Sequence, residues 1–277
     1  MSTVHVDNFS DFVTAIAVSG DTVVLPGSAE WDMNEIQPEG TGLITIACDK
    51  IEGQGTKIKN LRSTGGIAIS ASTEIDDLEM TNIVGTGYAG SWYGGNAWMY
   101  AGAYCQPEFN RCTFSGAFTS NVVAFMGGVS GSGGSTAVFT LDFCAFNVEL
   151  VNQTSYFLQQ CYMIPTGCRA VIHLPNTNVG INAFNDGGSH SATNCEVVVY
   201  APFVPIASCA LFQGCTVRGN LQSCETILAD SIITTSIYCT SDAPNAGISG
   251  SNFVGVTEAQ MKDADYLHNT GFLIGTE

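Results

Sequence analysis

The sequence predicts an all-β fold, a parallel β-helix in which short strands stack coil upon coil. A motif in which a small residue, usually Cys, precedes an apolar residue by two positions recurs at positions 78, 112, 144, 161, 195, 215, 231 and 251. Some gaps between these copies are about twice as long as the others. A short period indicates a solenoid, and a unit of roughly 16 to 20 residues holds three short strands but no helix pair. The longer gaps are interpreted as two units each, which gives about ten coils and a rod roughly 50 Å long.

The motif also predicts which side chains face the core. Residues two positions apart lie on one face of a strand, so each small residue and its apolar partner point inward together. Cysteine suits a stacked interior column because it is small and its weak S–H needs no strong partner, and serine has a similar volume. The predicted core column consists of Cys112, Cys144, Cys161, Cys195, Cys215, Ser231 and Ser251, with Leu78 as an earlier copy.

Composition excludes several classes of function. The 277 residues include 31 Gly, 45% apolar residues and 12% charged residues, which is not the composition of a disordered chain. The formal charge of −17, with only 8 Lys and Arg, argues against nucleic acid and anionic membranes as partners. No membrane insertion is expected, because glycines break the long uncharged run over 113–141. The first residues lack a charged segment followed by an apolar core, which predicts synthesis in the host cytoplasm without a signal peptide.

The cysteines predict neither a metal site nor a cofactor. The chain has 11 of them, an odd number, and no Cys-x-x-Cys pair. Reduced thiols on inward strand positions are favoured. Disulfides that form after release from a cell remain the alternative.

Both ends of the chain are expected to cover the open ends of the solenoid. Residues 7–19 form an amphipathic helix with Asn8 or Ser10 as its cap, and the helix buries a stripe made of Phe9, Phe12, Val13, Ile16 and Ala17. Such lids prevent exposed coil edges from stacking on another chain. The predicted division is a cap helix and first strand over 1–30, the β-helix over 31–255, and a cap helix (258–267) with a final strand within 256–277.

Residues 85–104 interrupt the rhythm with six aromatic residues among six glycines. One interpretation is a protruding loop that contacts a sugar or a protein partner. The other is a long bend whose aromatic side chains cover the core. The contact residues of the first interpretation are Tyr88, Trp92, Tyr93, Trp98, Tyr100 and Tyr104.

The stretch from Thr113 to Cys195 is poor in charge. Its only charged residues are Asp142, Glu149, Arg169 and Asp186. Charge depletion is typical of interface cores, whereas a monomeric rod normally carries more surface charge. Parallel association of three chains with closed symmetry would bury such a face. A neutral Ser, Thr and Asn surface without a partner is the alternative.

The N-terminal region resembles a known family. The pattern Phe-x-x-Ala-Ile-Ala over 12–17, the Gly-Asp-Thr-Val-Val-Leu strand over 20–25 and the segment around Trp31, followed by coils, are similar to the entry of pectate-lyase-like right-handed parallel β-helix proteins. The resemblance implies a right-handed solenoid. It also implies two kinds of function, since this fold occurs in polysaccharide-degrading enzymes and in phage spike or decoration proteins.

An enzyme of this family would need a specific set of side chains. Lyases use a basic residue and further cations beside the uronate, and glycoside hydrolases use two carboxylates about 5 to 9.5 Å apart. The segment 185–190 resembles polygalacturonase-like signatures, but it lacks the Asp-Asp pair and Gly-His-Gly, and no Arg-x-Lys follows. We therefore expect no catalytic residue. For an enzyme, the candidates are Asp142, Glu149, Asp186, His190 and Arg218.

The sequence thus favours a structural or adhesive protein of a phage virion, such as a capsid decoration, a collar or head spike, or a short tail spike. The expected partners are two further copies of the chain, other virion proteins and a cell-surface polysaccharide. A phage product leaves the cell by lysis and needs no signal peptide, which agrees with the N-terminus. The alternative is a polysaccharide lyase or glycoside hydrolase.

Overall fold

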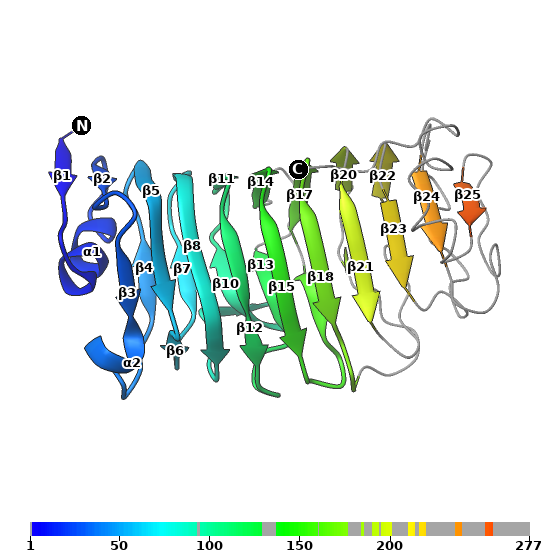
Figure 1. Ribbon diagram of the computed structural model, residues 1–277, viewed down its shortest axis with the longest axis horizontal. Coiled ribbons are helices and arrows are strands. Elements are labelled where there is room, and N and C mark those ends of the chain that lie inside the picture. The colour runs from blue at the N-terminus through cyan, green and yellow to red at the C-terminus, as the bar shows by residue number, and fades with distance from the viewer. Residues whose placement is uncertain are drawn as a thin grey trace.

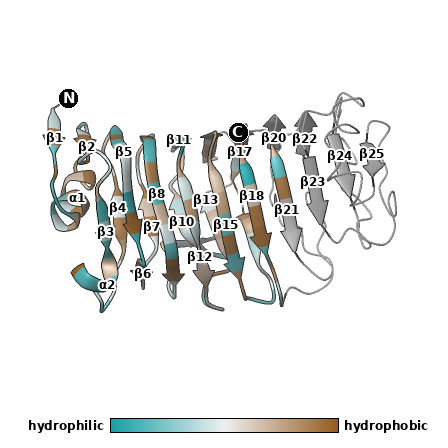
Figure 2. Cartoon of the chain, in the orientation of Figure 1, coloured by the Kyte–Doolittle hydropathy of each residue, from teal (hydrophilic) through white to brown (hydrophobic). Residues whose placement is uncertain are grey.

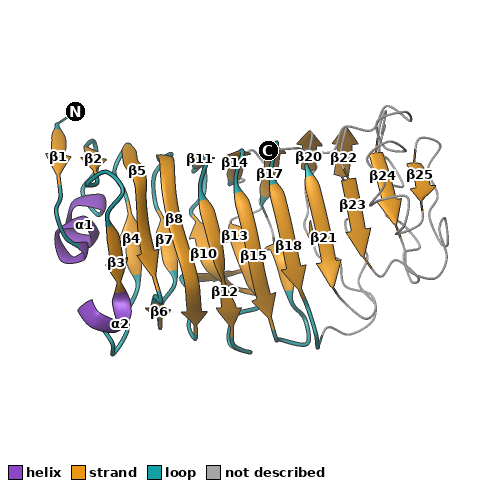
Figure 3. Ribbon diagram, in the orientation of Figure 1, coloured by secondary structure: helices purple, strands orange, loops and turns teal. Residues whose placement is uncertain are grey.

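The computed structural model describes residues 2–92, 95–128, 137–159 and 161–176, and the shorter stretches 184–185, 190–193, 195–200, 210–213, 216–219, 236–239 and 253–256. These residues form an all-β structure with parallel sheets and two short helices. Figure 3 shows both helices at one end of the molecule and strands along the rest of it. None of the helices in the described part is long and apolar enough to cross a bilayer.

The strands form three ladders, in each of which neighbouring strands are parallel. Ladder 1 contains β1 (Thr3–His5), β2 (Thr22–Val24), the first halves of β5 (Lys50–Lys59) and β8 (Glu74–Gly85), β11 (Glu108–Asn110), β14 (Val138–Asp142), β17 (Tyr162–Thr166), β20 (His190–Thr193) and β22 (Ala210–Gln213). Ladder 2 contains β3 (Glu30–Asp32), the second halves of β5 and β8, β6 (Arg62–Ser63), β12 (Thr113–Phe118), β15 (Ala145–Leu150), β18 (Arg169–His173), β21 (Glu196–Tyr200), β23 (Thr216–Gly219), β24 (Ser236–Cys239) and β25 (Phe253–Val256). Ladder 3 contains β4 (Ile44–Ile46), β7 (Ile67–Ile69), β10 (Gly95–Ala101), β13 (Ala124–Gly128), β16 (Tyr156–Gln159) and β19 (Phe184–Asn185), and β9 (Gly90–Trp92) pairs antiparallel with β10.

Successive repeats pair in register, and their length differs from the predicted one. Thr113 in β12 pairs with Glu79 in β8 on one side and with Ala145 in β15 on the other, and Ala145 pairs in turn with Arg169 in β18. The interpretation of the gaps from 78 to 112 and from 112 to 144 as two units each is therefore wrong, because each gap holds one repeat. Ladder 2 takes seven steps from β8 to β25, so this part is about 34 Å long by the strand spacing. Figure 1 shows these strands side by side along the long axis in chain order.

A helix covers the N-terminal end of the ladders. Helix α1 (Phe9–Ile16) begins at Asn8, whose side chain accepts a hydrogen bond from the Asp11 N–H at 3.0 Å. Its buried Phe9 and Phe12 pack on Trp31 of β3, with ring centroids 6.2 and 5.8 Å apart. The helix predicted over 7–19 is thus present with Asn8 as its cap. A second helix that the sequence did not predict, α2 (Met33–Ile36), follows β3, and the predicted C-terminal lid after β25 lies outside the described residues.

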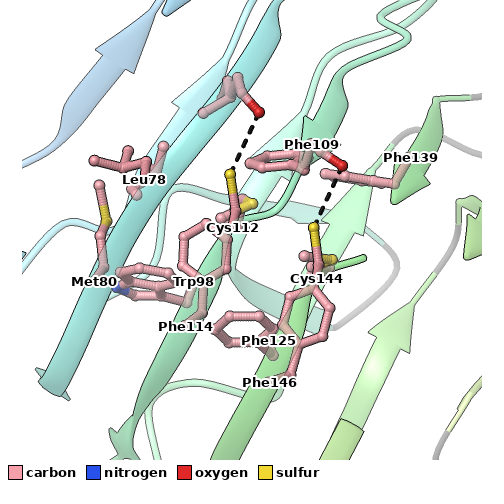
Figure 4. Close-up of a cluster of buried hydrophobic side chains, with 14 of the residues drawn as sticks. Leu78, Met80, Trp98, Phe109, Cys112, Phe114, Phe125, Phe139, Cys144 and Phe146 are labelled. Carbon is pink, nitrogen blue, oxygen red and sulfur yellow. Dashed lines mark hydrogen bonds between the residues drawn. The ribbon is translucent and has the colours of Figure 1, made fainter. Parts of the chain in front are cut away.

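The hydrophobic core is lined by inward residues of all three ladders, and its aromatic cluster joins ladders 2 and 3. The ring centroids of Phe114 in β12 and Phe125 in β13 lie 6.2 Å apart, and those of Phe146 in β15 and Phe157 in β16 lie 5.4 Å apart. Along the axis, Phe114 stacks on Phe146 at 5.8 Å and Phe125 stacks on Phe157 at 5.6 Å. Figure 4 shows part of this cluster, and Figure 2 shows hydrophobic and hydrophilic positions mixed along the strands. Such mixing is expected of strands with one face in the core.

Ladders 1 and 2 meet at a sharp corner with a repeated backbone conformation. The corner residues are Asp77, Arg111, Phe143 and Gly167, whose φ angles are 50°, 54°, 54° and 62°. The N–H of Arg111 donates to the Asp142 carbonyl and that of Phe143 donates to the Thr166 carbonyl, both at 2.8 Å. Each corner is therefore tied to the next repeat. These hydrogen bonds help to sustain a left-handed conformation that costs a non-glycine residue roughly 1–2 kcal/mol.

Replacing Phe125 by alanine should strongly destabilise the protein. Its ring contacts five other aromatic rings, at centroid distances from 5.4 Å to Phe118 up to 6.2 Å to Phe114. Removing it leaves a cavity, so Phe125→Ala should lower the free energy of unfolding by about 3–5 kcal/mol in urea titrations followed by circular dichroism. Val84→Ala, at a side chain that is 45% exposed, is the control. Equal losses for both variants would contradict this packing.

Candidate interaction and binding surfaces

The cysteines form an interior column. In each of four repeats, a buried Cys donates its thiol to a carbonyl of the preceding repeat, and three of the four directly follow a left-handed corner residue. These contacts are Cys112 to Ile75 at 3.3 Å, Cys144 to Phe109 at 3.3 Å, Cys168 to Leu141 at 3.2 Å and Cys195 to Pro165 at 3.5 Å. Figure 4 shows the first two. We call these four residues the thiol column.

One predicted member of the column lies elsewhere. Cys161 is buried, but it directly precedes β17 of ladder 1, and Cys168 occupies the place in the column. The sequence favours Cys161 for this place because the large apolar Met163 lies two positions later, whereas the residue two positions after Cys168 is the small Ala170. The remaining predicted members, Cys215, Ser231 and Ser251, lie outside the described residues.

The environment of two members of the thiol column, Cys144 and Cys168, disfavours their thiolate forms. The hydrogen bond with the Cys112 thiol, together with burial, raises the pKa of the Cys144 thiol to about 12. The pKa of the Cys168 thiol is also raised, because this thiol forms hydrogen bonds with Cys144 and Cys195 and is buried. Since the thiolate is the reactive and metal-binding form, the column acts as packing. Among the described residues, no group of three or more His, Cys, Asp or Glu side chains could hold a metal ion.

The aromatic residues of 85–104 do not form one surface. Trp98 is fully buried, and its Nε1–H donates to Ser63 Oγ at 3.1 Å. Tyr88 is 45% exposed and directly precedes Ala89, whose N–H donates to the Ala97 carbonyl of β10, whereas Tyr104 is 67% exposed and lies beyond the C-terminal end of β10. Tyr100 is half-buried, and a Cβ atom at Gly90 would lie 2.5 Å from its ring. The side chains of Trp92 and Tyr93 lie outside the described part of the structure.

Trp98 is therefore a core residue, and this position fits the interpretation of the segment as a cover of the core. Tyr88 and Tyr104 remain surface residues, but they lie in different connections, one before β9 and the other after β10. A single contact loop containing all six aromatic residues is not what the described part forms.

The candidate catalytic carboxylates lie on different ladders. Asp142 ends β14 of ladder 1, where it pairs in register with Asn110 and Thr166. Glu149 lies near the end of β15 in ladder 2, where it pairs with His173. The strand from Ala145 to Glu149 alone spans about 13 Å, so the two residues do not occupy neighbouring positions. Asp186 lies outside the described residues, and His190 and Arg218 are described only as backbone positions in β20 and β23.

Ion pairs gather on the early repeats. Lys50 lies 3.2 Å from Glu74 and 3.1 Å from Asp76, and its hydrogen bond to Asp76 is the main cause that raises its pKa. Other pairs before residue 112 in the described part are Lys50–Glu52, Lys57–Glu79, Lys59–Glu30 and Arg111–Asp77. Later in the chain, Arg169 pairs with Glu196 at 3.1 Å. Charge is thus concentrated at one end of the described molecule.

The outward side of β12, β15 and β18 forms a neutral face. Inward and outward positions alternate along these strands, as their burial shows. The outward uncharged residues, which we call the neutral face, are Thr113, Ser115, Ala117, Ala145, Asn147 and Val171. Glu79 borders this face on one side, and Glu149 and Arg169 border it on the others. The charge-poor stretch of sequence therefore includes a contiguous surface.

Two features were missed by sequence reasoning. The first is the in-register pair of Glu149 and His173. The second is Phe143, whose side chain is 68% exposed although it directly precedes a buried Cys. The repeated motif carried the signal for Phe143, because Phe143 occupies the position that Arg111 holds in the preceding copy.

A cavity of about 20 Å³ lies among Leu141, Phe146, Phe157 and Cys168, which is room for one water molecule.

No protein-family model matches the chain, and no curated protein matches it in sequence.

The thiol column should resist alkylation in the native protein. Burial blocks the reagent at all four thiols, and the raised pKa of Cys144 and Cys168 also reduces their thiolate fraction at pH 8. Iodoacetamide should therefore leave Cys112, Cys144 and Cys168 unmodified while it labels an outward thiol introduced on ladder 1 by Thr140→Cys, and all of them should react in urea. Mass spectrometry of peptides reads each site. Native labelling of Cys144 as fast as residue 140 would contradict the column.

Proposed function

We propose that this chain is a right-handed parallel β-helix that serves as a structural or adhesive protein of a phage virion and assembles as a homotrimer through the neutral face. Three parallel ladders joined repeat by repeat support the β-helix. The right-handed winding of the proposed β-helix is supported by the strong preference of connections between parallel strands for right-handed crossovers. The virion assignment is supported by the resemblance of the N-terminal region and by fold analogy.

The proposed trimer is supported mainly by the lack of charged residues on the neutral face. The chain has a formal charge of −17, so two copies repel each other over most of their surface. This repulsion is weakest along the neutral face, where small residues such as Ser115, Ala117 and Ala145 let two sheets approach closely. Closed threefold symmetry would use the same surface on every chain and keep the assembly finite.

An enzymatic function has less support. The carboxylates that a hydrolase would pair, Asp142 and Glu149, occupy separate ladders. The region around Asp142 is also acidic, with Glu108 on the neighbouring strand β11 and Asp76 on β8, one strand further along the ladder. Such a surface repels the uronates that lyases of this fold cleave.

The assembly is tested by light scattering on purified protein. A chain of 29.1 kDa should give a trimer of about 87 kDa (3 × 29.1). Asn147→Glu places a charge in the middle of the neutral face and should give monomers, because burying an unpaired carboxylate costs several kcal/mol. Thr140→Glu adds the same charge to the outward side of ladder 1 and should leave the trimer intact. If the wild-type protein is a monomer at micromolar concentration, the proposed trimer is wrong.

The virion assignment needs its own measurement. Mass spectrometry of purified particles from the phage that encodes the chain should find its peptides in fixed proportion to a capsid protein. Particles that lack the chain, obtained from a lysate in which it is abundant, would show that it acts elsewhere.

A further inference from the structure

The corner between ladders 1 and 2 holds an aromatic residue that the fold does not require there. Phe143 is 68% exposed and has a φ angle of 54°. Glycine or asparagine adopts this left-handed conformation at lower cost than phenylalanine. A strained backbone position with an exposed aromatic ring is a reason to look for a binding role.

The ring of Phe143 is held in place. Its own N–H is bonded to the Thr166 carbonyl at 2.8 Å. On the next repeat, a Cβ atom at Gly167 would lie 2.7 Å from Cδ1 and Cε1 of the ring, so the ring rests on the space that the missing side chain leaves. The rest of the ring remains open to solvent, and binding to it would require little ordering of the side chain.

A fixed polar group lies on the other side of the ring. Arg111 is the corner residue of the preceding repeat, about one strand spacing (~4.8 Å) away along the axis. Its Nε donates to Asp77 Oδ1 at 2.6 Å and its Nη2 donates to Oδ2 at 2.8 Å. The hydrogen bond from Arg111 also lowers the pKa of Asp77, so the pair is fully charged at neutral pH. A guanidinium has five N–H donors, so three remain for a ligand on this half-exposed pair.

We propose that this corner, made of Phe143, Arg111 and Asp142, binds a neutral saccharide. One sugar ring stacks its apolar face on Phe143, and its hydroxyl groups accept from the Arg111 guanidinium and donate to the Asp142 carboxylate. A sugar ring fits because it combines one apolar face with hydroxyls that both donate and accept. Both polar partners belong to this corner, since Asp142 directly precedes Phe143 and the Arg111 N–H donates to the Asp142 carbonyl at 2.8 Å.

The surrounding charge decides which saccharide is favoured. Asp76, Asp77, Glu108 and Asp142 lie on the adjoining strands or corners, and these carboxylates repel an anionic sugar. A protein partner fits less well, because one ring and its neighbours offer far less than the ~800 Å² per partner of a typical interface. The inference goes beyond the proposed assembly, since one chain carries every residue of the corner.

The test measures binding of neutral glucose, galactose and mannose hexasaccharides, with a galacturonate oligomer as the anionic comparison. Titration calorimetry and saturation-transfer NMR should detect at least one neutral hexasaccharide and no galacturonate. Phe143→Asn should weaken that binding about tenfold, which corresponds to the loss of one aromatic contact. Its melting temperature should stay the same or rise, since asparagine tolerates this backbone conformation.

Tyr104→Ala is the matched control, because Tyr104 is 67% exposed and has a φ angle of 64° at a different corner. It should leave saccharide binding unchanged. The proposal is overturned if no neutral hexasaccharide binds at millimolar concentration, or if both variants bind alike. A changed mass of Phe143→Asn in light scattering without any saccharide binding would assign the corner to chain contacts instead. A monomer that binds saccharide would support this site while it contradicts the trimer.

Discussion

In-register pairing of parallel strands is the constraint on which this structure depends. A repeat can pair along its whole length only if it turns its corners where the previous repeat turned them. The left-handed residue before Leu78, Cys112, Cys144 and Cys168 performs this turn, and its N–H bonds to the next repeat wherever Arg111, Phe143 and Gly167 occupy the corner. Once the corners coincide, inward positions coincide as well. The thiol column and the stacked phenylalanines are consequences of that alignment.

The corner also explains why a small residue follows it. The side chain at that position approaches a carbonyl of the preceding repeat to within 3.2–3.5 Å in the thiol column. Cysteine fills the space and donates a weak hydrogen bond without needing a second partner. In the described core, these cysteines therefore serve to pack the interior. Any function of the described part must use its outer surface, where the neutral face and the Phe143 corner differ most from the ion-paired early repeats.

The sequence reveals the parallel strands, the N-terminal helix and the inward side of Cys112, Cys144 and Cys195, because all of these follow from spacings of two or of three to four residues. It does not reveal the length of a repeat, since the connections between ladders vary and leave no periodic signal. Cys168 escapes notice because its partner two positions on is the small Ala170 rather than a large apolar residue. The exposure of Phe143 is hidden for a related reason: a corner residue breaks the alternation by which strand positions are assigned.

Cross-linking across one repeat tests the alignment most directly. Residues 115 and 147 are paired in register on the outward side, whereas 115 and 171 lie two steps apart. A bifunctional thiosulfonate with a reach of about 5 Å, close to one strand spacing, should join Ser115→Cys to Asn147→Cys within one chain in high yield. It should not join Ser115→Cys to Val171→Cys. Equal yields for the two pairs, or no intramolecular product for 115 and 147, would contradict the placement of these two residues on adjacent repeats.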